Sequence, residues 1–385
     1  MTRYEDFVAS KLSRPAPDGL EPVGEPWPRL FPFQADLTRW ALRRGRSAIF
    51  ADTGLGKTSM ELTWAREVSA QTGGDVLILT PLAVAPQVVA EAVMLGDLVS
   101  FADKDPTPGV HVLNYDRLHR IDPSAYAGVV LDESSCLKHQ DSSTFSRLCE
   151  AFRDTPYRLA ATATPAPNDW TELGTHAEFL GVCTRAEMLS EFFCHDGGET
   201  QDWKLKGHAR GAFWRWVSSW AALIKRPSDL GYDDDRYALP PLEVVERVVA
   251  GSAVSEGALC VTVAATLQER RAARKASIPS RVAACVADVN AEPGESWVIW
   301  CDLNAEGDAL SAAMPDAVEV RGSDDPDAKE ARLAGFASGK HRILISKPSI
   351  CGWGLNWQHA ARMAFVGVTD SWEAYYQAVR RCWRF

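Results

Sequence analysis

The stretch AIFADTGLGKTS, residues 48–59, is a short apolar run followed by two closely spaced glycines and a Lys-Thr pair. A phosphate-binding loop has the general pattern GxxxxGK[ST], and Ala51 occupies the position of its first glycine. Glycines let backbone N–H groups turn toward phosphates, and a helix beginning near Lys57 would add the positive end of its dipole. Lys57 would then reach the β- and γ-phosphates, and the Thr58 hydroxyl would hold Mg²⁺. Unless the stretch is only a tight strand-to-helix turn, the nucleotide-binding residues here are Thr53, Gly54, Leu55, Gly56, Lys57 and Thr58.

Short apolar runs alternate with longer segments of helical spacing along the whole chain. Such runs, rich in Val, Ile and Leu, are typical of buried parallel strands. In the first half they are SAIFA (47–51), DVLILT (75–80), VHVLN (110–114), GVVLDE (128–133) and RLAATAT (158–164). In the second half, strand-like runs are EVVERVV (243–249), WVIWC (297–301), AVEV (317–320), RILIS (342–346) and RMAFVG (362–367). We therefore predict an α/β protein with two parallel sheets in tandem.

The order of these elements divides the chain into four segments. Residues 1–29 form an extended lead-in, because six prolines between residues 11 and 32 exclude a helix or a central strand. The first α/β domain spans 30–178, a helical, basic and tryptophan-rich insertion with a connector spans 179–240, and the second α/β domain spans 241–385. The chain stops after an arginine-rich helical segment without a closing strand, so we expect the second domain to be incomplete at its C-terminus.

The composition is that of a globular protein, with 46% hydrophobic and 24% charged residues. No run approaches the roughly 18 apolar residues of a membrane span, and the start, MTRYEDFVAS, lacks a signal-peptide core. We therefore expect a cytoplasmic protein without membrane contacts. The formal net charge of −10 argues against a polycation that coats nucleic acid, so any DNA contact must come from local patches.

A second chemical motif ends the strand-like run GVVLDE (128–133), 75 residues after Lys57. Asp132 would hold the metal ion of a nucleotide hydrolase, and Glu133 would orient or deprotonate the attacking water. Two carboxylates after an apolar strand are also common caps of a following helix. Paired with the loop, however, they predict metal-dependent nucleotide hydrolysis.

The two motifs together resemble superfamily 2 helicases. The loop form AxxGxGKT, here ADTGLGKT from Ala51, is similar to their phosphate loop, and DESS (132–135) is similar to their DExx box. Ala51 is therefore the signature of a helicase-type loop. The likeness is to the Swi/Snf-like branch, related to DEAD/DEAH-box proteins, and above all to compact helicases of bacteriophages and prophages. Ser135 departs from the histidine that is usual in this branch.

Further motifs of that family follow in the family's order. Gln34 in LFPFQ resembles the adenine-reading glutamine, and LILTPLAVAPQ (77–87) and VLNYD (112–116) resemble segments that contact DNA. ATATPAPNDWTELG (161–174) resembles the motif that links hydrolysis to domain movement, which assigns this role to Thr162 and Thr164. LIKRPSDLGYDDDRYALPPLEVV (223–245) is similar to the branch's connector between domains.

The last two matches lie near the end of the chain. ISKPSICGWGLNW (345–357) resembles the GxGLN motif, which implies nucleotide contacts for Gly354 and Asn356. QAVRRCWRF (377–385) resembles the QxxxRxxR motif, with Gln377 in coupling and with Arg381 and Arg384 as catalytic arginines. The resemblance implies two RecA-like domains with ATP between them, and Arg384 is the preferred contact of the γ-phosphate. Such arginines make hydrolysis depend on domain closure. Part of this basic segment could instead complement a helix dipole.

The stretch WKLKGHARGAFWRWVSSWAALIKR (203–226) has six basic residues, five aromatic residues and no acidic residue. Cations and aromatic faces together favour nucleic acid. Phe213, Trp216 and Trp220 have the spacing of one apolar helix face, which favours core packing for these rings. The candidate DNA contacts are therefore Lys204, Lys206 and Arg210.

These observations predict an ATP-dependent DNA translocase or helicase with ATP and Mg²⁺ as cofactors. The resemblance implies double-stranded DNA as the track and a bacterial or phage-infected cell as the location. The alternatives are an RNA helicase, or a non-motor DNA-binding or scaffold subunit of a restriction, methylation or recombination complex. A P-loop kinase fits less well, because it has no need of paired arginines so far beyond the loop.

Overall fold

The computed structural model describes residues 19–82, 84–104, 106–138, 140–195, 203–249, 266–352 and 354–384. The chain divides into two compact units, Met1–Ala238 and Leu239–Phe385, called unit 1 and unit 2 below. No helix within the described ranges is long and apolar enough to span a bilayer.

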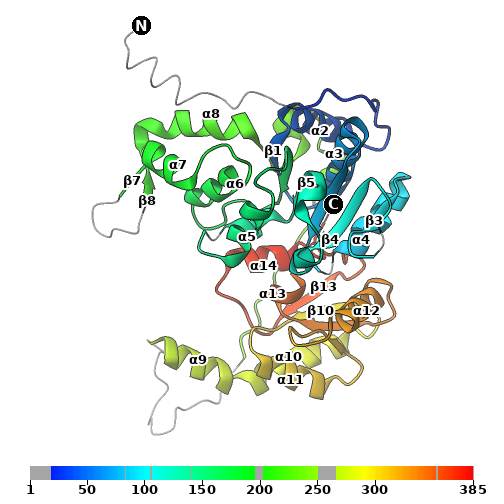
Figure 1. Ribbon diagram of the computed structural model, residues 1–385. Coiled ribbons are helices and arrows are strands. Elements are labelled where there is room, and N and C mark those ends of the chain that lie inside the picture. Colours follow the sequence, from blue (N-terminus) through cyan, green and yellow to red (C-terminus); the bar gives the residue numbers. More distant parts are fainter. Residues whose placement is uncertain are drawn as a thin grey trace. The chain divides into compact units, whose positions relative to one another are not determined.

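Unit 1 is built on a seven-stranded parallel sheet with the order β3-β4-β2-β5-β6-β1-β9 (Figure 1). Its strands are β1 (Arg46–Ala51), β2 (Asp75–Thr80), β3 (Val99–Phe101), β4 (Val110–Asn114), β5 (Tyr126–Asp132), β6 (Tyr157–Ala161) and β9 (Ala221–Ile224). The central strands are buried along most of their length because helices cover both faces. Their apolar runs are therefore the ones that the sequence pattern identified.

The helices of unit 1 form a layer on each face of this sheet. They are α2 (Pro32–Arg44), α3 (Lys57–Thr72), α4 (Ala85–Leu95), α5 (Ser143–Ala151), α6 (Leu173–Phe179), α7 (Arg185–Phe192) and α8 (Arg210–Trp220). α2 and α3 pack on β1, β2 and β5. α5, α6, α7 and α8 contribute to a second core on the opposite face, where Phe213 and Trp220 are buried. The core interpretation of these two rings is confirmed.

Two parts of the 179–240 segment differ from the helical expectation. β7 (Phe193–His195) and β8 (Trp203–Leu205) form an antiparallel hairpin. Residues 221–224 leave α8 and become β9, which pairs in parallel with β1 at the edge of the sheet. Backbone groups at the edge of β1 pair with residues 221–224. The sequence AALI has no local pattern that predicts this pairing.

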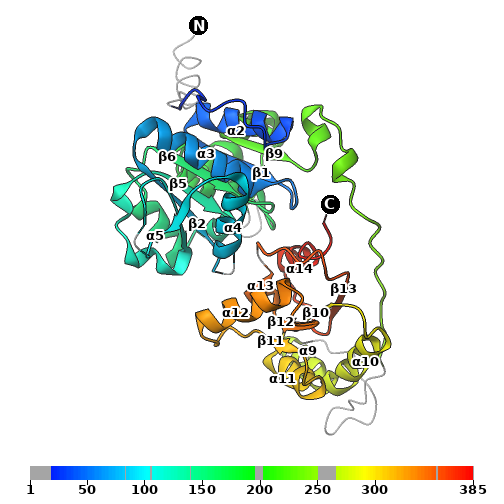
Figure 2. The same ribbon diagram turned by 90° about the vertical axis from the view of Figure 1, so that its right-hand side faces the viewer.

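Unit 2 contains a four-stranded parallel sheet with the order β11-β12-β10-β13 (Figure 2). The strands are β10 (Trp297–Trp300), β11 (Val318–Glu319), β12 (Ile343–Ser346) and β13 (Arg362–Phe365). The helices are α9 (Leu267–Ala276), α10 (Ile278–Ala291), α11 (Asn304–Ala313), α12 (Pro326–Ala337), α13 (Pro348–Cys351) and α14 (Trp372–Val379). Ile299 and Ile345 face the apolar side of α10, whereas Trp300 packs near Trp357 on the other face. The prediction of an α/β protein with two parallel sheets is confirmed, and the arrangement is consistent with tandem RecA-like domains.

The strand predicted over 243–249 is wrong, because these residues form neither helix nor strand. Val244, Val245 and Val248 are exposed, the last to 89%. Within the segment, Arg247 forms an ion pair with Asp288 of α10. A strand is stable only when a neighbour satisfies its backbone groups, and an apolar pattern alone does not supply that neighbour.

Candidate nucleotide site

The phosphate loop connects the end of β1 to the start of α3 and depends on two glycines in the left-handed region. Gly54 has φ 95°, and Gly56, which caps α3, has φ 73°. A Cβ at Gly56 would lie 2.3 Å from Nε2 of Gln34. The positive φ therefore favours glycine at this position, and a Cβ would also displace the Gln34 amide.

Gln34 lies on α2 and fastens that helix to the phosphate loop. Its Nε2 donates to the Leu55 carbonyl at 2.9 Å, and its Oε1 accepts the Phe31 N–H at 2.9 Å. The side chain is buried. The two bonds fix the glutamine side chain against the loop.

Lys57 is the first residue of α3, and backbone carbonyls at the start of the loop hold its ammonium group. Nζ donates to the carbonyls of Ala51 at 2.9 Å and Asp52 at 3.3 Å. Burial lowers the pKa of Lys57, while the nearby carboxyl groups of Glu133 and Asp132 act in the opposite direction. Lys57 and the acid pair are therefore close enough to influence one another electrostatically.

Asp132 ends β5, the neighbour of β2 and β6 in the sheet. Oγ1 of Thr80, at the end of β2, donates to Oδ2 of Asp132 at 3.1 Å, and the Tyr115 hydroxyl donates to its backbone carbonyl at 2.7 Å. Burial, and then the charge of Glu133, raise the pKa of this carboxyl. A divalent cation would offset both effects, and the oxygen donors Asp132 and Thr58 suit Mg²⁺, a hard ion.

Glu133 has a strained backbone. Its φ of 52° is the only positive value outside glycine in the described part of the chain. Oγ1 of Thr162 donates to its Oε2 at 3.3 Å, and Thr162 Oγ1 in turn accepts the Thr164 N–H at 3.2 Å. The structure thus brings Thr162 and Thr164, which follow β6, to the acid that follows β5.

The sequence reading missed Glu61, which lies one helical turn beyond Lys57 on α3. Its side chain is 1% exposed, and neither carboxyl oxygen has a hydrogen-bond partner among the described residues. Burial, and then Asp132, raise the pKa of Glu61 well above its ordinary value. A glutamate within a helical pattern ordinarily indicates a solvated face, so no local signal marked it.

His176 of α6 was missed for the same reason. It is fully buried, its Nε2 lies 3.2 Å from the Ser134 hydroxyl, and its ring meets Phe50 edge-on at 5.1 Å between centroids. Burial lowers its pKa to about 4, so the ring is neutral at pH 7. His176 therefore joins the residue after Glu133 to the strand that leads into the phosphate loop.

The candidate arginines lie in unit 2. Arg381 is fully buried and donates to the Leu355 carbonyl at 3.1 Å and to the Gln377 side chain at 2.7 Å. Arg384 donates to the same Leu355 carbonyl at 2.9 Å. The glycine-rich segment and the arginine segment are thereby joined next to Gly354, which has φ 71°. Asn356 is exposed and donates to Gln358 at 3.3 Å.

The three candidate DNA contacts lie on or beside β8 and α8 in unit 1. Lys204 and Arg210 are exposed. Lys206 donates to the carbonyls of Ser190 and Glu191 at 2.9 and 2.8 Å. Lys206 thus satisfies carbonyls near the end of α7, which is a structural role in this conformation.

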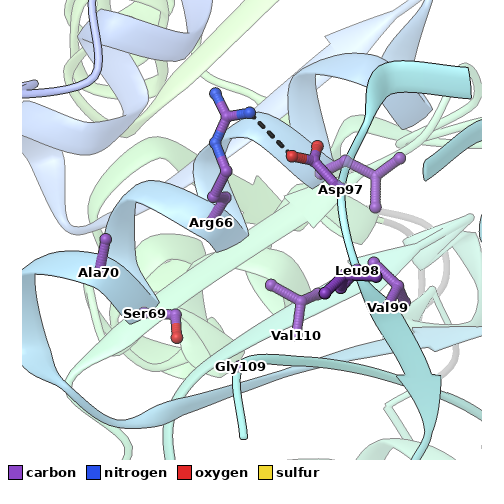
Figure 3. Close-up of a pocket in the computed structure, with 9 residues that line it drawn as sticks. Arg66, Ser69, Ala70, Asp97, Leu98, Val99, Gly109 and Val110 are labelled. Carbon is purple, nitrogen blue, oxygen red and sulfur yellow. Dashed lines mark hydrogen bonds and ion pairs between the residues drawn. The ribbon is translucent and has the colours of Figure 1, made fainter. Parts of the chain in front are cut away.

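A separate surface hollow lies at the other end of α3 (Figure 3). An ion pair between Arg66 and Asp97, 2.8 Å long, borders it, and it is also lined by Ser69, Leu98 and Val110. None of the residues predicted for the nucleotide site lines this hollow. It therefore adds nothing to that site.

Comparison with known proteins finds similar solved structures. No protein-family model matches the chain, and no curated protein matches it. A similar solved structure is the Sulfolobus solfataricus SWI2/SNF2 ATPase core in complex with dsDNA, with 15% identity and a TM-score of 0.43. The match covers 88% of this chain and 82% of that one.

Proposed function

We propose that this protein is an ATP-dependent DNA translocase or helicase that uses Mg·ATP. The observation that supports the proposal most is that Lys57 lies close enough to Asp132 and Glu133, near the carboxyl ends of β1 and β5, for their charges to oppose the lowering of its pKa by burial. Open parallel sheets bind ligands at this edge. A phosphate-binding lysine beside two acids is the constellation that nucleotide hydrolysis needs.

In this proposal the candidate residues of unit 1 have the following roles. The loop N–H groups and Lys57 bind the phosphates, and Gln34 lies against the base. Thr58 and Asp132 would hold Mg²⁺, which would neutralise charge on the phosphates. Glu133 would orient the attacking water and accept its proton, and Thr162 holds its carboxylate. Thr162 and Thr164 would link hydrolysis to domain movement.

Unit 2 would complete the site when ATP binds. Arg384 is the proposed contact of the γ-phosphate, and Arg381, Gln377, Gly354 and Asn356 would form its surroundings. Stabilising transition-state charge in this way is worth roughly 10³- to 10⁵-fold in rate where arginine fingers have been measured. Hydrolysis would then follow closure of the two units.

Double-stranded DNA is the proposed track, with translocation favoured over strand separation by the sequence resemblance. An RNA track, or a non-motor role in a restriction, methylation or recombination complex, is the competing hypothesis. The phage or prophage likeness and a cytoplasmic location stay predictions from the sequence.

Steady-state ATPase with duplex DNA, with RNA and without nucleic acid tests the proposal. We expect duplex DNA to stimulate hydrolysis more than RNA does, and Lys57→Ala to abolish it. Lys340→Ala, which removes an exposed lysine of unit 2, is the matched control and should leave the rate unchanged. Equal rates for Lys57→Ala and the parent chain would rule out ATP hydrolysis at this site.

A further inference from the structure

A pair of tryptophans lies on unit 1 outside the nucleotide site. Trp170 belongs to a short 3₁₀ turn, Trp170–Glu172, and is 46% exposed. Its ring meets Trp214 of α8 edge-on, with centroids 5.0 Å apart and planes at 81°. Trp214 is only partly buried against the core, whereas its neighbour Phe213 is completely buried. The outer side of α8 therefore carries an indole pair that the core does not enclose.

Two arginines accompany this pair. Arg210 lies one helical turn before Trp214 and is exposed, as is Arg215. The Arg215 guanidinium folds back along the helix, 3.8 Å from the point where a side chain at Gly211 would begin. Residues i and i+4 share a helix face, so cation and indole are neighbours here. Trp170, Trp214, Arg210 and Arg215 are called the tryptophan surface below.

The surroundings of the tryptophan surface favour an anionic partner. No acidic residue occurs between positions 203 and 226, although the chain as a whole carries −10. Two acids beside Trp170 oppose this preference, and each accepts a local hydrogen bond. Asp169 accepts the Thr171 N–H at 2.7 Å, and Glu172 accepts from the Asn168 side chain at 2.8 Å.

We propose that the tryptophan surface binds DNA, with the arginines on phosphates and the exposed Trp170 indole against a sugar or base. This inference deepens the function proposed above and rests on it for the identity of the polymer. Guanidinium groups neutralise phosphates, and aromatic rings give nucleic-acid surfaces a contact that tolerates any sequence.

The tryptophan surface is also connected with the catalytic acid through a short length of chain. Thr162, whose hydroxyl bonds Glu133, and Trp170 lie eight residues apart in the same segment between β6 and α6. DNA on Trp170 would therefore act on the segment that holds Glu133. A DNA contact here would influence hydrolysis as well as affinity.

Equilibrium binding of the full chain to a labelled DNA duplex at several salt concentrations tests the proposal. Arg210→Ala/Arg215→Ala should lower the slope of log K against log salt by about 2. Trp170→Ala should weaken binding about tenfold while leaving that slope unchanged. The matched controls are Arg271→Ala/Lys275→Ala, which also removes two exposed charges, and Trp372→Ala, which removes an indole that is 62% exposed.

Several outcomes would overturn the proposal. One is that the surface variants bind DNA with the affinity of the parent chain and with the same slope of log K against log salt. Another is an equal loss in the matched controls, because that would indicate a general charge or folding effect. If polyglutamate binds with the same dependence on Trp170, the partner of this surface is an acidic protein and not DNA. Thermal unfolding of each variant checks its fold.

The same variants separate this proposal from that of ATP hydrolysis. If hydrolysis depends on Lys57 but the surface variants bind DNA as tightly as the parent chain, the DNA-binding role of the tryptophan surface is refuted. The proposal of ATP hydrolysis then stands. If the surface variants lose DNA binding and the parent chain hydrolyses no ATP, the DNA-binding role of the tryptophan surface stands. The proposal of ATP hydrolysis is then refuted.

Discussion

Glu133, the proposed general base, has a strained backbone with φ 52°. A non-glycine residue with positive φ costs on the order of 1–3 kcal/mol, and such residues persist where their surroundings hold them. Here the last residue of β5 precedes Glu133, and a buried 3₁₀ turn, Ser134–Leu137, follows it. The carboxylate accepts a hydrogen bond from the Thr162 hydroxyl.

Glu133→Asn should therefore separate stability from activity. Asparagine tolerates the left-handed region better, so we expect the free energy of unfolding to stay the same or rise by up to about 1 kcal/mol. ATP hydrolysis should fall by roughly 10²- to 10⁴-fold, because the general base is lost. Urea unfolding and single-turnover hydrolysis measure the two effects. Glu330→Asn on α12 is the control, and an active Glu133→Asn variant would contradict the assignment.

His176 should make stability depend on pH. Its pKa of about 4 lies below the ordinary value near 6.5, so the unfolded chain binds a proton first as the pH falls. The stability that the neutral ring contributes is complete above pH 6.5 and declines between pH 6.5 and 4, by on the order of 3 kcal/mol.

Urea unfolding of the parent chain and of His176→Leu at pH 7 and pH 5 measures this contribution. The loss of stability between the two pH values should be smaller in the variant. An equal loss in both proteins would show that other groups cause the pH dependence.

At the scale of elements, Gln34 of α2 contacts the loop between β1 and α3. Gly56→Ala should destabilise the protein and weaken ATP binding, because the new Cβ meets Gln34 and the backbone has positive φ. The total cost should be about 1–3 kcal/mol.

Gly73→Ala is the matched control for this prediction. Gly73 also has positive φ, 69°, but no atom lies within 4 Å of its new Cβ. The difference between the two variants, measured by urea unfolding and ATP titration, reports the clash alone. Gln34→Ala combined with Gly56→Ala should recover part of that difference, and no recovery would refute the contact as its source.

At the scale of the whole molecule, the two units are joined by residues without helix or strand. Arg247 in this segment has a side chain that is 67% exposed, and no Lys or Arg occurs between it and Arg270. Brief trypsin digestion should therefore cut after Arg247 early and release a large and a small fragment. Mass spectrometry identifies the cut, and Arg247→Gln should remove it. Earlier cleavage within the sheet of either unit would contradict this prediction.

The sequence by itself was enough to predict the central strands of both sheets, the glycine turn between β1 and α3, and the place of Asp132 and Glu133 at the end of the β5 run. Central parallel strands are buried on both faces, so they must be continuous apolar runs, and a phosphate loop needs glycines and lysine at fixed spacing. These are local requirements that neighbouring residues express together.

Tertiary structure alone decided the pairing of β9 with β1, the unpaired state of 243–249, and the burial of Glu61, His176 and Arg381. His176 meets Ser134 across 42 positions of sequence, and Arg381 meets Leu355 across 26. Such contacts depend on which faces pack together. The same glutamate, histidine or arginine would be a solvated residue on an open helix face, and only packing removes it from water.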